Sequence, residues 1–409
     1  MKRNTRLGLR LALAAAVCSL PISAISCSAS SDGSTVGSGG SSNGGSGNNG
    51  GNAGDNFGGT TGIDANGGSG GGLPNGCAGD RYDGEPVPLD ILILLDRSGS
   101  MSDSGKWGSV TSSINTFLTS VTGDGVAVGI TFFPVPWSTN PNLPASCTSS
   151  AECGAYGPCI PGFNKCNGGL LGLTDSCVSV DYTQPRVPIT ALPGAASQIQ
   201  QAMAAESPGG DSTPVAPALK GVHDYAKVWA EAHTDHQVVV VLATDGEPNN
   251  CTDNSVSTSA GYAAAGLAGN PSVKTFVIGI GDLGVLNTIA QQGGTNSAYI
   301  VSSGNAGQGF LDAMNEIRGA VKCQYKIPTP AEGDPNPDKV NVGITQEGME
   351  QDVVPQVSGP GACVGQPGWY YDNPSNPTQI LLCPASCDIV EYSDSVVVDV
   401  VIGCDTVVR

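Results

Sequence analysis

The chain has 409 residues, of which 36 are acidic and 17 are basic, so its formal net charge at pH 7 is −19. Proteins that bind nucleic-acid backbones need clustered Lys and Arg, and this balance therefore argues against a nucleic-acid partner. An excess of negative charge is instead typical of a protein that stays soluble through self-repulsion.

The first 26 residues have the pattern of a bacterial export signal. Residues 1–6 are rich in basic side chains, and residues 7–20 are apolar apart from Arg10 and Ser19. An apolar stretch of this length, with these flanks, is too short for a stable membrane span. We therefore predict a signal peptide over residues 1–26 and an exported protein.

Cys27 is a candidate site of lipid attachment. The small residue Ser26 precedes it, and the segment resembles a lipobox, although Ala24 stands where leucine is usual. Ser28 follows where an aspartate would be a retention signal, which resembles lipoproteins that go on to the outer membrane. The prediction is a lipoprotein of the outer membrane or cell surface, anchored at Cys27. The alternative is a plainly secreted or periplasmic protein.

Residues 27–84 are predicted to form a flexible tether. Gly, Ser, Asn, Thr and Ala make up almost all of this segment as far as residue 75, and no periodic apolar face interrupts them. A coil of this composition has a root-mean-square reach on the order of 35–40 Å. Such a tether would hold a folded domain clear of a membrane surface.

Residues 85–322 alternate between apolar runs and helical patterns. The predicted strands cover residues 89–95, 126–133, 238–243, 273–280 and 298–301, and the predicted helices cover residues 106–121, 195–205, 215–232, 259–267, 283–291 and 309–321. Alternation of this kind is typical of parallel strands joined by crossover helices. We therefore predict an α/β domain with a doubly wound, mostly parallel sheet flanked by helices.

Two further segments depart from this alternation. Residues 134–187 hold five cysteines among Gly, Pro, Ser and Asn, which predicts a Cys-rich insertion after the second strand. Residues 323–409 show short β-branched runs at residues 339–344, 379–382 and 395–402, separated by turn residues. These runs predict a small antiparallel β module, and its cysteines would staple a core too small to be stable alone.

Cysteine usage agrees with export. Of 14 cysteines, Cys18 and Cys27 fall in the signal region, which leaves 12, an even number. In an exported chain such a set predicts disulfides rather than zinc. Because the insertion holds an odd number, at least one of its cysteines should pair outside it, with Cys77 or Cys251 as candidates. A bridge to Cys251 would fix the loop that follows Asp245.

Five oxygen-bearing side chains lie where predicted buried strands end or a helix begins. Asp96, Ser98 and Ser100 follow residues 89–95, Asp245 follows residues 238–243, and Thr213 precedes residues 215–232. Ligands of an open parallel sheet bind beyond the carboxyl ends of its strands. Hydroxyls with few carboxylates suit Mg²⁺, which prefers octahedral oxygen coordination and keeps some of its water. We therefore predict a divalent-cation site, with Mg²⁺ favoured over Mn²⁺ or Ca²⁺.

These residues resemble the von Willebrand factor type A domain with its metal-ion-dependent adhesion site. The D-x-S-x-S motif is Asp96 to Ser100, the isolated threonine is Thr213, and the second aspartate is Asp245. Three separated segments in the correct order are far more specific than any one of them alone. The simpler alternative is that these residues only cap helices and open turns.

The resemblance implies a binding protein rather than an enzyme. A ligand protein would offer an acidic residue to the bound cation, and the chain would act in adhesion at the cell surface or envelope. The alternative is a structural or assembly lipoprotein in which the metal only stabilises the fold. An enzyme that uses the cation as a Lewis acid is the third alternative, but no general base is visible beside the cluster.

Other chemistry finds little support in the sequence. His233 and His236 fall where a predicted helix gives way to a strand, which favours histidines of a turn over half of a zinc site. The chain contains no H-E-x-x-H, and G-x-S-x-G occurs only by composition within the Gly/Ser-rich tether, at residues 40–44 and 67–71. Residues 334–338 resemble the start of a calcium loop but lack its glycine and its final glutamate, so a proline-stiffened turn is expected.

Overall fold

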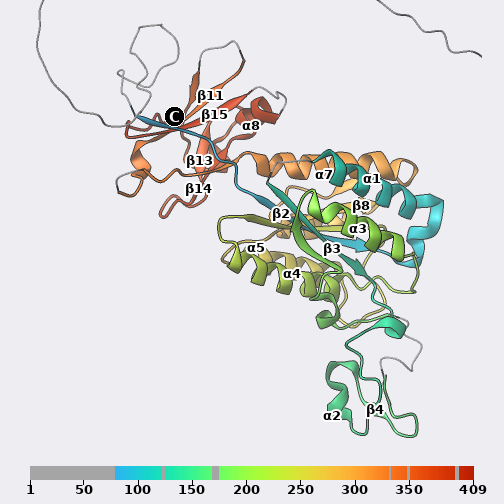
Figure 1. The fold of residues 1–409 in the computed structure, drawn as a ribbon. Coiled ribbons are helices and arrows are strands. Elements are labelled where there is room, and N and C mark those ends of the chain that lie inside the picture. Colours follow the sequence, from blue (N-terminus) through green and yellow to red (C-terminus); the bar gives the residue numbers. More distant parts are fainter. Residues whose placement is uncertain (1–78, 122–124, 168–174, 331–332, 348–350, 392–395) are drawn as a thin grey trace, which may run out of the picture. The chain divides into compact units, whose positions relative to one another are not determined.

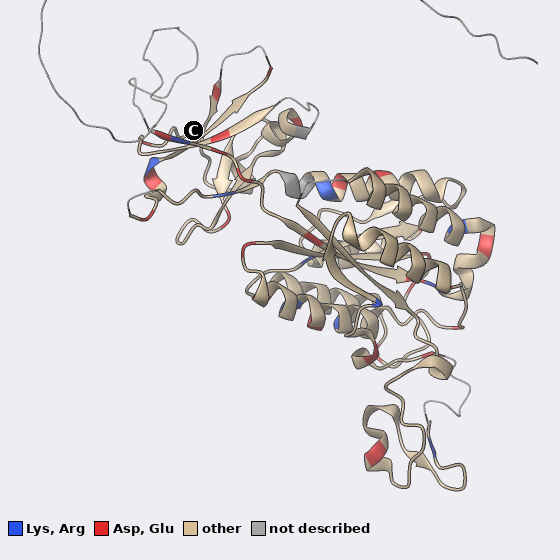
Figure 2. Cartoon of the chain, in the orientation of Figure 1, with Lys and Arg blue, Asp and Glu red and all other residues tan. Residues whose placement is uncertain are grey.

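The computed structural model describes residues 79–121, 125–167, 175–330, 333–347, 351–391 and 396–409. The predicted signal peptide, Cys27, Cys77 and most of the predicted tether lie outside these residues. Within the described ranges, no helix combines the length and apolar character needed to cross a membrane. In Figure 2 the basic residues of the described part are scattered singly rather than gathered in one patch.

A six-stranded sheet forms the centre of the α/β domain (Figure 1). Its strand order is β6-β3-β2-β7-β8-β9, and neighbouring strands are parallel except that β6 runs antiparallel to β3. The strands are β2 (Leu89–Asp96), β3 (Val126–Phe133), β6 (Val187–Ala191), β7 (Gln237–Thr244), β8 (Lys274–Ile280) and β9 (Tyr299–Val301). The predicted doubly wound, mostly parallel sheet is confirmed.

Helices cover both faces of this sheet (Figure 1). One face packs against α1 (Lys106–Ser120), α3 (Gly194–Ala205) and α7 (Ala306–Lys322). The other packs against α4 (Val215–Ala232), α5 (Val256–Leu267) and α6 (Asn287–Gln292). Short 3-10 helices lie at η2 (Gly99–Gly105), η7 (Gly284–Leu286) and η8 (Ser303–Asn305).

The two central strands, β2 and β7, are buried on both faces. Along β2, Ile91, Ile93 and Leu95 belong to one core, whereas Leu92 and Leu94 belong to the other, as the alternation of strand side chains requires. Each fully buried Leu or Ile contributes roughly 1.5–3 kcal/mol relative to an exposed one. The carboxyl ends of β2 and β7 are therefore rigid points from which loops depart.

The Cys-rich insertion forms small elements of its own. They are η3 (Trp137–Thr139), α2 (Ser150–Cys153), η4 (Gly154–Tyr156), β4 (Cys159–Ile160), β5 (Lys165–Cys166) and η6 (Ser179–Tyr182). Disulfides Cys147–Cys159 and Cys153–Cys166 hold its small core together. Three of these sulfurs lie close together, but disulfide sulfurs offer no thiolate to a metal.

A third disulfide joins the end of the insertion to the α/β domain. Cys177 pairs with Cys251, which follows Asp245 in the loop after β7. The prediction that an odd cysteine of the insertion reaches Cys251 is therefore confirmed.

In the described residues, the C-terminal segment forms two antiparallel sheets, one of them with β1, together with one α-helix and two 3-10 helices. One sheet has the order β1-β15-β11-β12 and the other β10-β14-β13. The elements are β1 (Asp80–Asp83), β10 (Gln324–Lys326), η9 (Pro337–Lys339), β11 (Val340–Thr345), β12 (Asp352–Val354), η10 (Pro360–Ala362), β13 (Trp369–Tyr371), β14 (Gln379–Leu382), α8 (Pro384–Glu391) and β15 (Val397–Ile402).

Disulfides hold the core of this module together. Cys323 pairs with Cys387 and Cys363 with Cys383, while Cys404 is disulfide-bonded as well. Trp369 is fully buried in its core and contacts Tyr371 edge-on. One difference from the sequence analysis lies at the start, because β1 falls in the segment predicted as tether yet pairs with β15.

Candidate metal centre

Asp96 is the last residue of β2, and its carboxylate is completely buried. Its Oδ1 accepts a hydrogen bond from the backbone N–H of Ser98 at 2.7 Å, and its Oδ2 accepts one from the hydroxyl of Thr244 at 2.5 Å. Burial, with a smaller contribution from the nearby Asp245, outweighs these hydrogen bonds and raises the pKa of Asp96 to about 6. Asp96 therefore fixes the start of the loop and the position of Thr244.

The loop after Asp96 carries the two serines. Arg97 and Ser98 lead directly into η2, and the N–H of Gly99 donates to the carbonyl of Gly210 at 3.2 Å. The hydroxyl oxygens of Ser98 and Ser100 lie 3.1 Å apart. The turn that Asp96 anchors thus places two hydroxyls side by side.

Asp245 comes from the neighbouring strand. Strands β2 and β7 pair in parallel register, with Leu95 opposite Ala243, so Asp245 emerges beside Asp96. The hydroxyl of Ser100 donates to Asp245 Oδ1 at 2.7 Å, and Lys106 Nζ contacts Asp245 Oδ2 at 2.7 Å. Asp96, Ser98, Ser100 and Asp245 therefore form one hydrogen-bonded cluster.

Thr213 lies in the loop before α4 and is buried. Its N–H donates to Asn249 Oδ1 at 3.0 Å, and its hydroxyl accepts from Asn249 Nδ2 at 3.2 Å. Asn254 Nδ2 donates to the Thr213 carbonyl at 2.9 Å. A Cβ built on Gly246 would lie 3.4 Å from the Thr213 hydroxyl oxygen, which places Thr213 beside the residue after Asp245.

The base of the insertion holds the loops of this cluster from outside. Asp175 Oδ2 accepts hydrogen bonds from the N–H of Asp211 at 2.9 Å and from the hydroxyl of Ser212 at 2.7 Å, just before Thr213. The disulfide between Cys177 and Cys251 ties the same base to the loop after Asp245. One short segment, residues 175–177, thus positions two of the three loops that supply the site.

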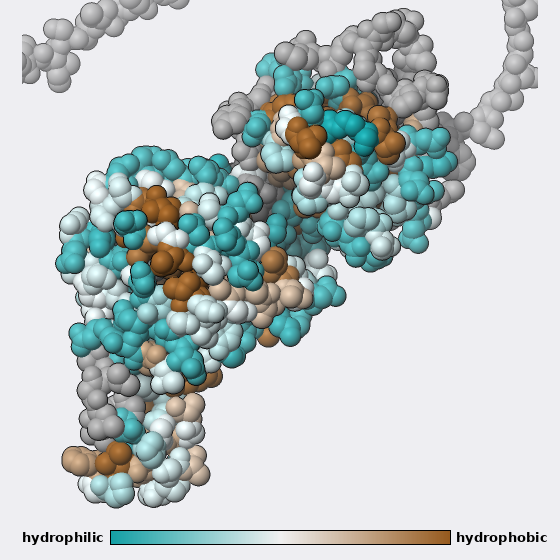
Figure 3. All heavy atoms as spheres, turned by 180° about the vertical axis from the view of Figure 1, so that it is seen from behind, coloured by the Kyte–Doolittle hydropathy of each residue, from teal (hydrophilic) through white to brown (hydrophobic). Residues whose placement is uncertain are grey.

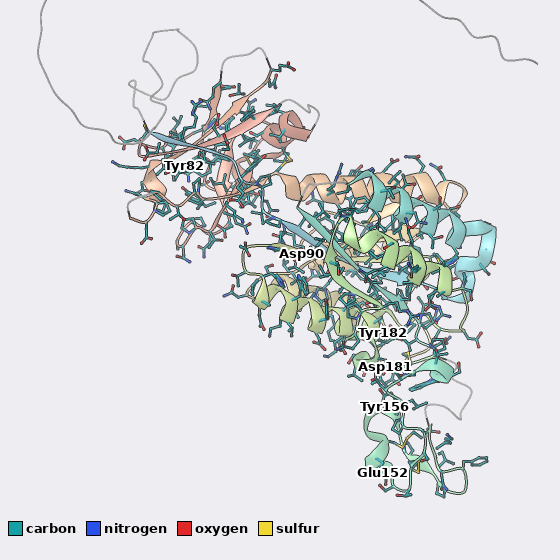
Figure 4. All side chains as sticks on the ribbon, in the orientation of Figure 1. Tyr82, Asp90, Glu152, Tyr156, Asp181 and Tyr182 are labelled. Atoms are coloured by element: carbon teal, nitrogen blue, oxygen red, sulfur yellow. A yellow bond between two sulfur atoms is a disulfide. The ribbon has the colours of Figure 1, made fainter. Side chains whose placement is uncertain are left out.

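A second buried acid connects the insertion internally. Asp181 accepts hydrogen bonds from Asn140 Nδ2 at 2.6 Å, Asn142 Nδ2 at 2.9 Å and the Tyr156 hydroxyl at 2.6 Å. Figure 4 labels Tyr156 and Asp181, whose side chains meet, and the neighbouring Tyr182. Burial and the negative charge of Asp181 raise the pKa of Tyr156 well above its ordinary value. This acid organises the insertion and makes no direct hydrogen bond to the oxygen cluster.

The donor set suits a small, hard cation. Mg²⁺ takes oxygen ligands at about 2.0–2.1 Å in octahedral geometry, so adjacent ligand oxygens lie about 3 Å apart. The separation of 3.1 Å between the hydroxyl oxygens of Ser98 and Ser100 matches one such edge. Both oxygens of Asp96 and both of Asp245 already have protein partners, so these carboxylates suit contact through water.

The sequence missed several residues that shape this cluster. Thr244, Lys106, Asn249 and Asp175 all contact it or its loops, but none belongs to the D-x-S-x-S pattern. Thr244 has a usable signal, since it directly precedes Asp245. Asp175 has none, because its partner Ser212 lies 37 residues away in the chain.

The comparisons with known proteins give likenesses to solved structures at low sequence identity. No family model matches the chain, and no curated protein matches it. Among solved structures, it is similar to proximal thread matrix protein 1 from the mussel byssus, with 17% identity, a TM-score of 0.37, and coverage of 60% of this chain and 51% of that one.

The chain is also similar to two other solved structures. One is a von Willebrand factor type A protein from Catenulispora acidiphila, with 12% identity, a TM-score of 0.35, and coverage of 78% of this chain and 59% of that one. The other is the manganese-loaded TRAP protein of Plasmodium vivax, with 14% identity, a TM-score of 0.34, and coverage of 68% and 95%. The chain thus spans about half to three fifths of the first two neighbours. Likenesses at these scores carry no argument about family or function.

Proposed function

We propose that this protein is an envelope-anchored or cell-surface binding protein of the von Willebrand factor type A kind. It would bind a protein ligand through a divalent cation, Mg²⁺ first, held by Ser98, Ser100 and Thr213. Asp96 and Asp245 would act from the second coordination shell. The observation that carries the proposal is the hydroxyl pair of Ser98 and Ser100, 3.1 Å apart beside Asp245.

The charges of the cluster favour an acidic ligand. A divalent cation would contribute two positive charges and Lys106 one, against one negative charge each from Asp96 and Asp245, which leaves a net charge of about one positive unit. Hydroxyl ligands add no charge. A ligand carboxylate would neutralise this excess and occupy a remaining coordination position. A bound cation would supply Lewis acidity, and the chain would supply the oxygens and their orientation.

The cluster favours binding over turnover. A hydrolytic enzyme needs a general base within hydrogen-bonding reach of the reacting group. In the described part of the chain, both carboxylates of the cluster are already engaged by donors, and the three histidines lie on α4 and in the turn after it. This arrangement supports the proposal of a binding protein.

The disulfides support a role outside the cytoplasm. Five disulfides form among the described cysteines, and such bridges persist in oxidising compartments. The predicted signal peptide and Cys27 would deliver the chain to the outer membrane or cell surface. The predicted tether would then separate the α/β domain from the membrane.

One observation favours a second candidate, a purely structural metal. The Asp245 side chain is wholly buried, and protein groups already satisfy both its oxygens. A cation in such a site would only tie the loops after β2 and β7 together. Its removal would then lower the melting temperature without releasing any partner.

The experiment compares three versions of the full chain as bait for an envelope extract, each with Mg²⁺ and with chelator. The wild type is set against Ser98→Ala/Ser100→Ala and against Ser102→Ala, a control whose hydroxyl bonds only the Gly99 carbonyl in the same loop. We expect proteins captured by the wild type and the control with Mg²⁺ to be lost with chelator and with the double variant. Identical capture in all conditions, with only the melting temperature responding to chelator, would establish the structural metal.

A further inference from the structure

The turn between α4 and β7 holds two histidines at the end of the sheet opposite the oxygen cluster. His233 follows the last residue of α4, and His236 directly precedes β7. Both side chains are partly exposed. Asp90 on β2, labelled in Figure 4, lies buried behind them.

Hydrogen bonds fix the tautomer of both rings. His233 Nδ1 contacts the carbonyl oxygen of Trp229 at 2.9 Å, and His236 Nδ1 contacts Asp90 Oδ2 at 3.0 Å. A carbonyl and a carboxylate oxygen only accept, so each neutral ring carries its proton on Nδ1. The lone pair of each ring is therefore on Nε2. Histidines that bind metals are oriented in this way, by a carboxylate or a backbone carbonyl on the other nitrogen.

Packing also holds the rings in place. His233 stacks on Trp229 with ring centroids 4.1 Å apart and an interplanar angle of 18°. Trp229 Nε1 donates to Asp90 Oδ2 at 2.6 Å, the oxygen that also accepts from His236. The buried carboxylate of Asp90 thus orients both the ring of His236 and the tryptophan on which His233 stacks.

The distance between the two ring centres matches the distance expected for two imidazoles that share one metal ion. Zinc binds imidazole nitrogen at about 2.0–2.1 Å, which puts the ion about 3.2 Å from each ring centre, so two rings at a tetrahedral angle have centroids about 5.2 Å apart. The centroids of His233 and His236 are 5.3 Å apart.

We propose that His233 and His236 bind one divalent transition-metal ion, Zn²⁺ or Cu²⁺, through their Nε2 atoms. Solvent completes the coordination, and Asp235 is the neighbouring carboxylate. Asp235 Oδ1 lies 3.9 Å from His236 Nε2, and its Oδ2 lies 3.4 Å from Lys326 Nζ. Because Asp235 is exposed, rotation of its side chain can bring it to the ion as a third ligand.

The sequence favours plain turn histidines at these positions. The structure adds the hydrogen bonds that orient both rings. Satisfying the buried Asp90 explains the contact with His236, but it does not explain the matching Nδ1 contact of His233 with a backbone carbonyl. The proposed site is independent of the oxygen cluster. Imidazole nitrogen suits Zn²⁺ and Cu²⁺, whereas an all-oxygen site suits Mg²⁺.

The test titrates the full chain with Zn²⁺ by calorimetry, in non-reducing buffer with excess Mg²⁺. The variants are His233→Gln, His236→Gln and, as control, His223→Gln, which removes the third histidine of the chain from the interior. We expect one Zn²⁺ per wild-type chain, at least about a tenfold loss of affinity in each of the first two variants, and none in the control.

Electron paramagnetic resonance with Cu²⁺ reads the ligands directly. The wild type should show hyperfine coupling to two nitrogens, and each single variant should show coupling to one. Equal Zn²⁺ affinity in wild type and the two turn variants would overturn the proposal. Loss in only one of them would overturn it too, because a single histidine would then explain the binding.

Discussion

Strand β2 carries a buried aspartate near each of its ends, and the two serve different chemistry. Asp90 is 1% exposed and Asp96 is 0% exposed, and only six positions separate them. Asp90 accepts N–H donors from Trp229 and His236, whereas Asp96 accepts from Ser98 and Thr244 and faces a second carboxylate. The two aspartates therefore differ in role because different side chains and loops surround them at the two ends of β2.

The two ends also differ in how they are held. At the amino end, Trp229 on the last turn of α4 and His236 in the turn that follows are the partners of Asp90. At the carboxyl end, three loops from distant parts of the chain must meet, and residues 175–177 clamp two of them. Both partners of Asp90 come from one continuous stretch of the chain, whereas the carboxyl end depends on separate loops, a disulfide and a buried acid.

The largest expected effect comes from removing that disulfide. The Cys177–Cys251 bridge closes a loop of 74 residues, and by the chain-entropy relation its loss costs about 4 kcal/mol of stability. The double change Cys177→Ala/Cys251→Ala should therefore lower the free energy of unfolding in denaturant titrations. It should also weaken Mg²⁺ binding measured by calorimetry, because the loop after Asp245 loses its clamp.

The matched control is Cys147→Ala/Cys159→Ala. This bridge lies within the insertion and closes a loop of 12 residues, so its loss costs about 3 kcal/mol by the same relation. It should leave Mg²⁺ affinity unchanged. Equal weakening of Mg²⁺ binding in both pairs would show that the carboxyl end does not depend on this particular clamp.

His223, the third histidine of the chain, is buried in the interior, unlike the two partly exposed histidines of the turn. Its Nε2 contacts the Thr275 hydroxyl at 2.8 Å, and burial lowers the pKa of His223 to about 4. The unfolded chain, with an ordinary pKa near 6.5, then binds more protons between about pH 6.5 and 4, so this contribution to stability is lost as pH falls. The loss approaches about 3 kcal/mol.

Denaturant titrations from pH 7 to 4.5 test this effect. The wild type should lose more stability over that range than His223→Gln, whereas His233→Gln should follow the wild type. Parallel curves for the wild type and His223→Gln would show that this imidazole is not kept neutral by the fold.

Much of the fold was predictable because its main elements follow strong local patterns. The predicted strand 126–133 and helix 215–232 coincide with β3 and α4, since continuous apolar runs and helical periodicity survive folding unchanged. Strand β6 was missed because Pro188 interrupts its sequence. An edge strand tolerates proline where no ladder partner needs its N–H.

The cluster was only partly predictable. Asp96, Ser98, Ser100 and Asp245 meet as predicted because they follow adjacent parallel strands, whose carboxyl ends share one edge of the sheet. The role of Lys106 depends on how η2 folds back, which no local pattern encodes. The partners of Asp90 were hidden for the same reason, because Trp229 lies 139 residues away.

A loss of stability of intermediate size is expected from a change at Asp90, near the amino end of β2. The change Asp90→Ala leaves the N–H of Trp229 without its acceptor and frees the ring of His236. An unsatisfied buried donor and a lost charged hydrogen bond together cost about 2 kcal/mol. Denaturant titration should show this loss, while Mg²⁺ affinity stays unchanged, and Asp235→Ala is the exposed control. A fall in Mg²⁺ affinity would contradict the independence of the two ends.

The smallest expected effect concerns Lys106, which pairs with Asp245 beyond the carboxyl ends of β2 and β7. Its Nζ lies 2.7 Å from Asp245 Oδ2, and its side chain is only 12% exposed. A bound divalent cation must share Asp245 with this ammonium, so Lys106→Met should raise Mg²⁺ affinity, by about tenfold after solvent screening. Lys220→Met, an exposed lysine paired with Asp224 on α4, is the control and should change nothing. Weaker Mg²⁺ binding by Lys106→Met would instead show that the lysine positions Asp245 for the cation, which would make it a supporting residue rather than a competitor.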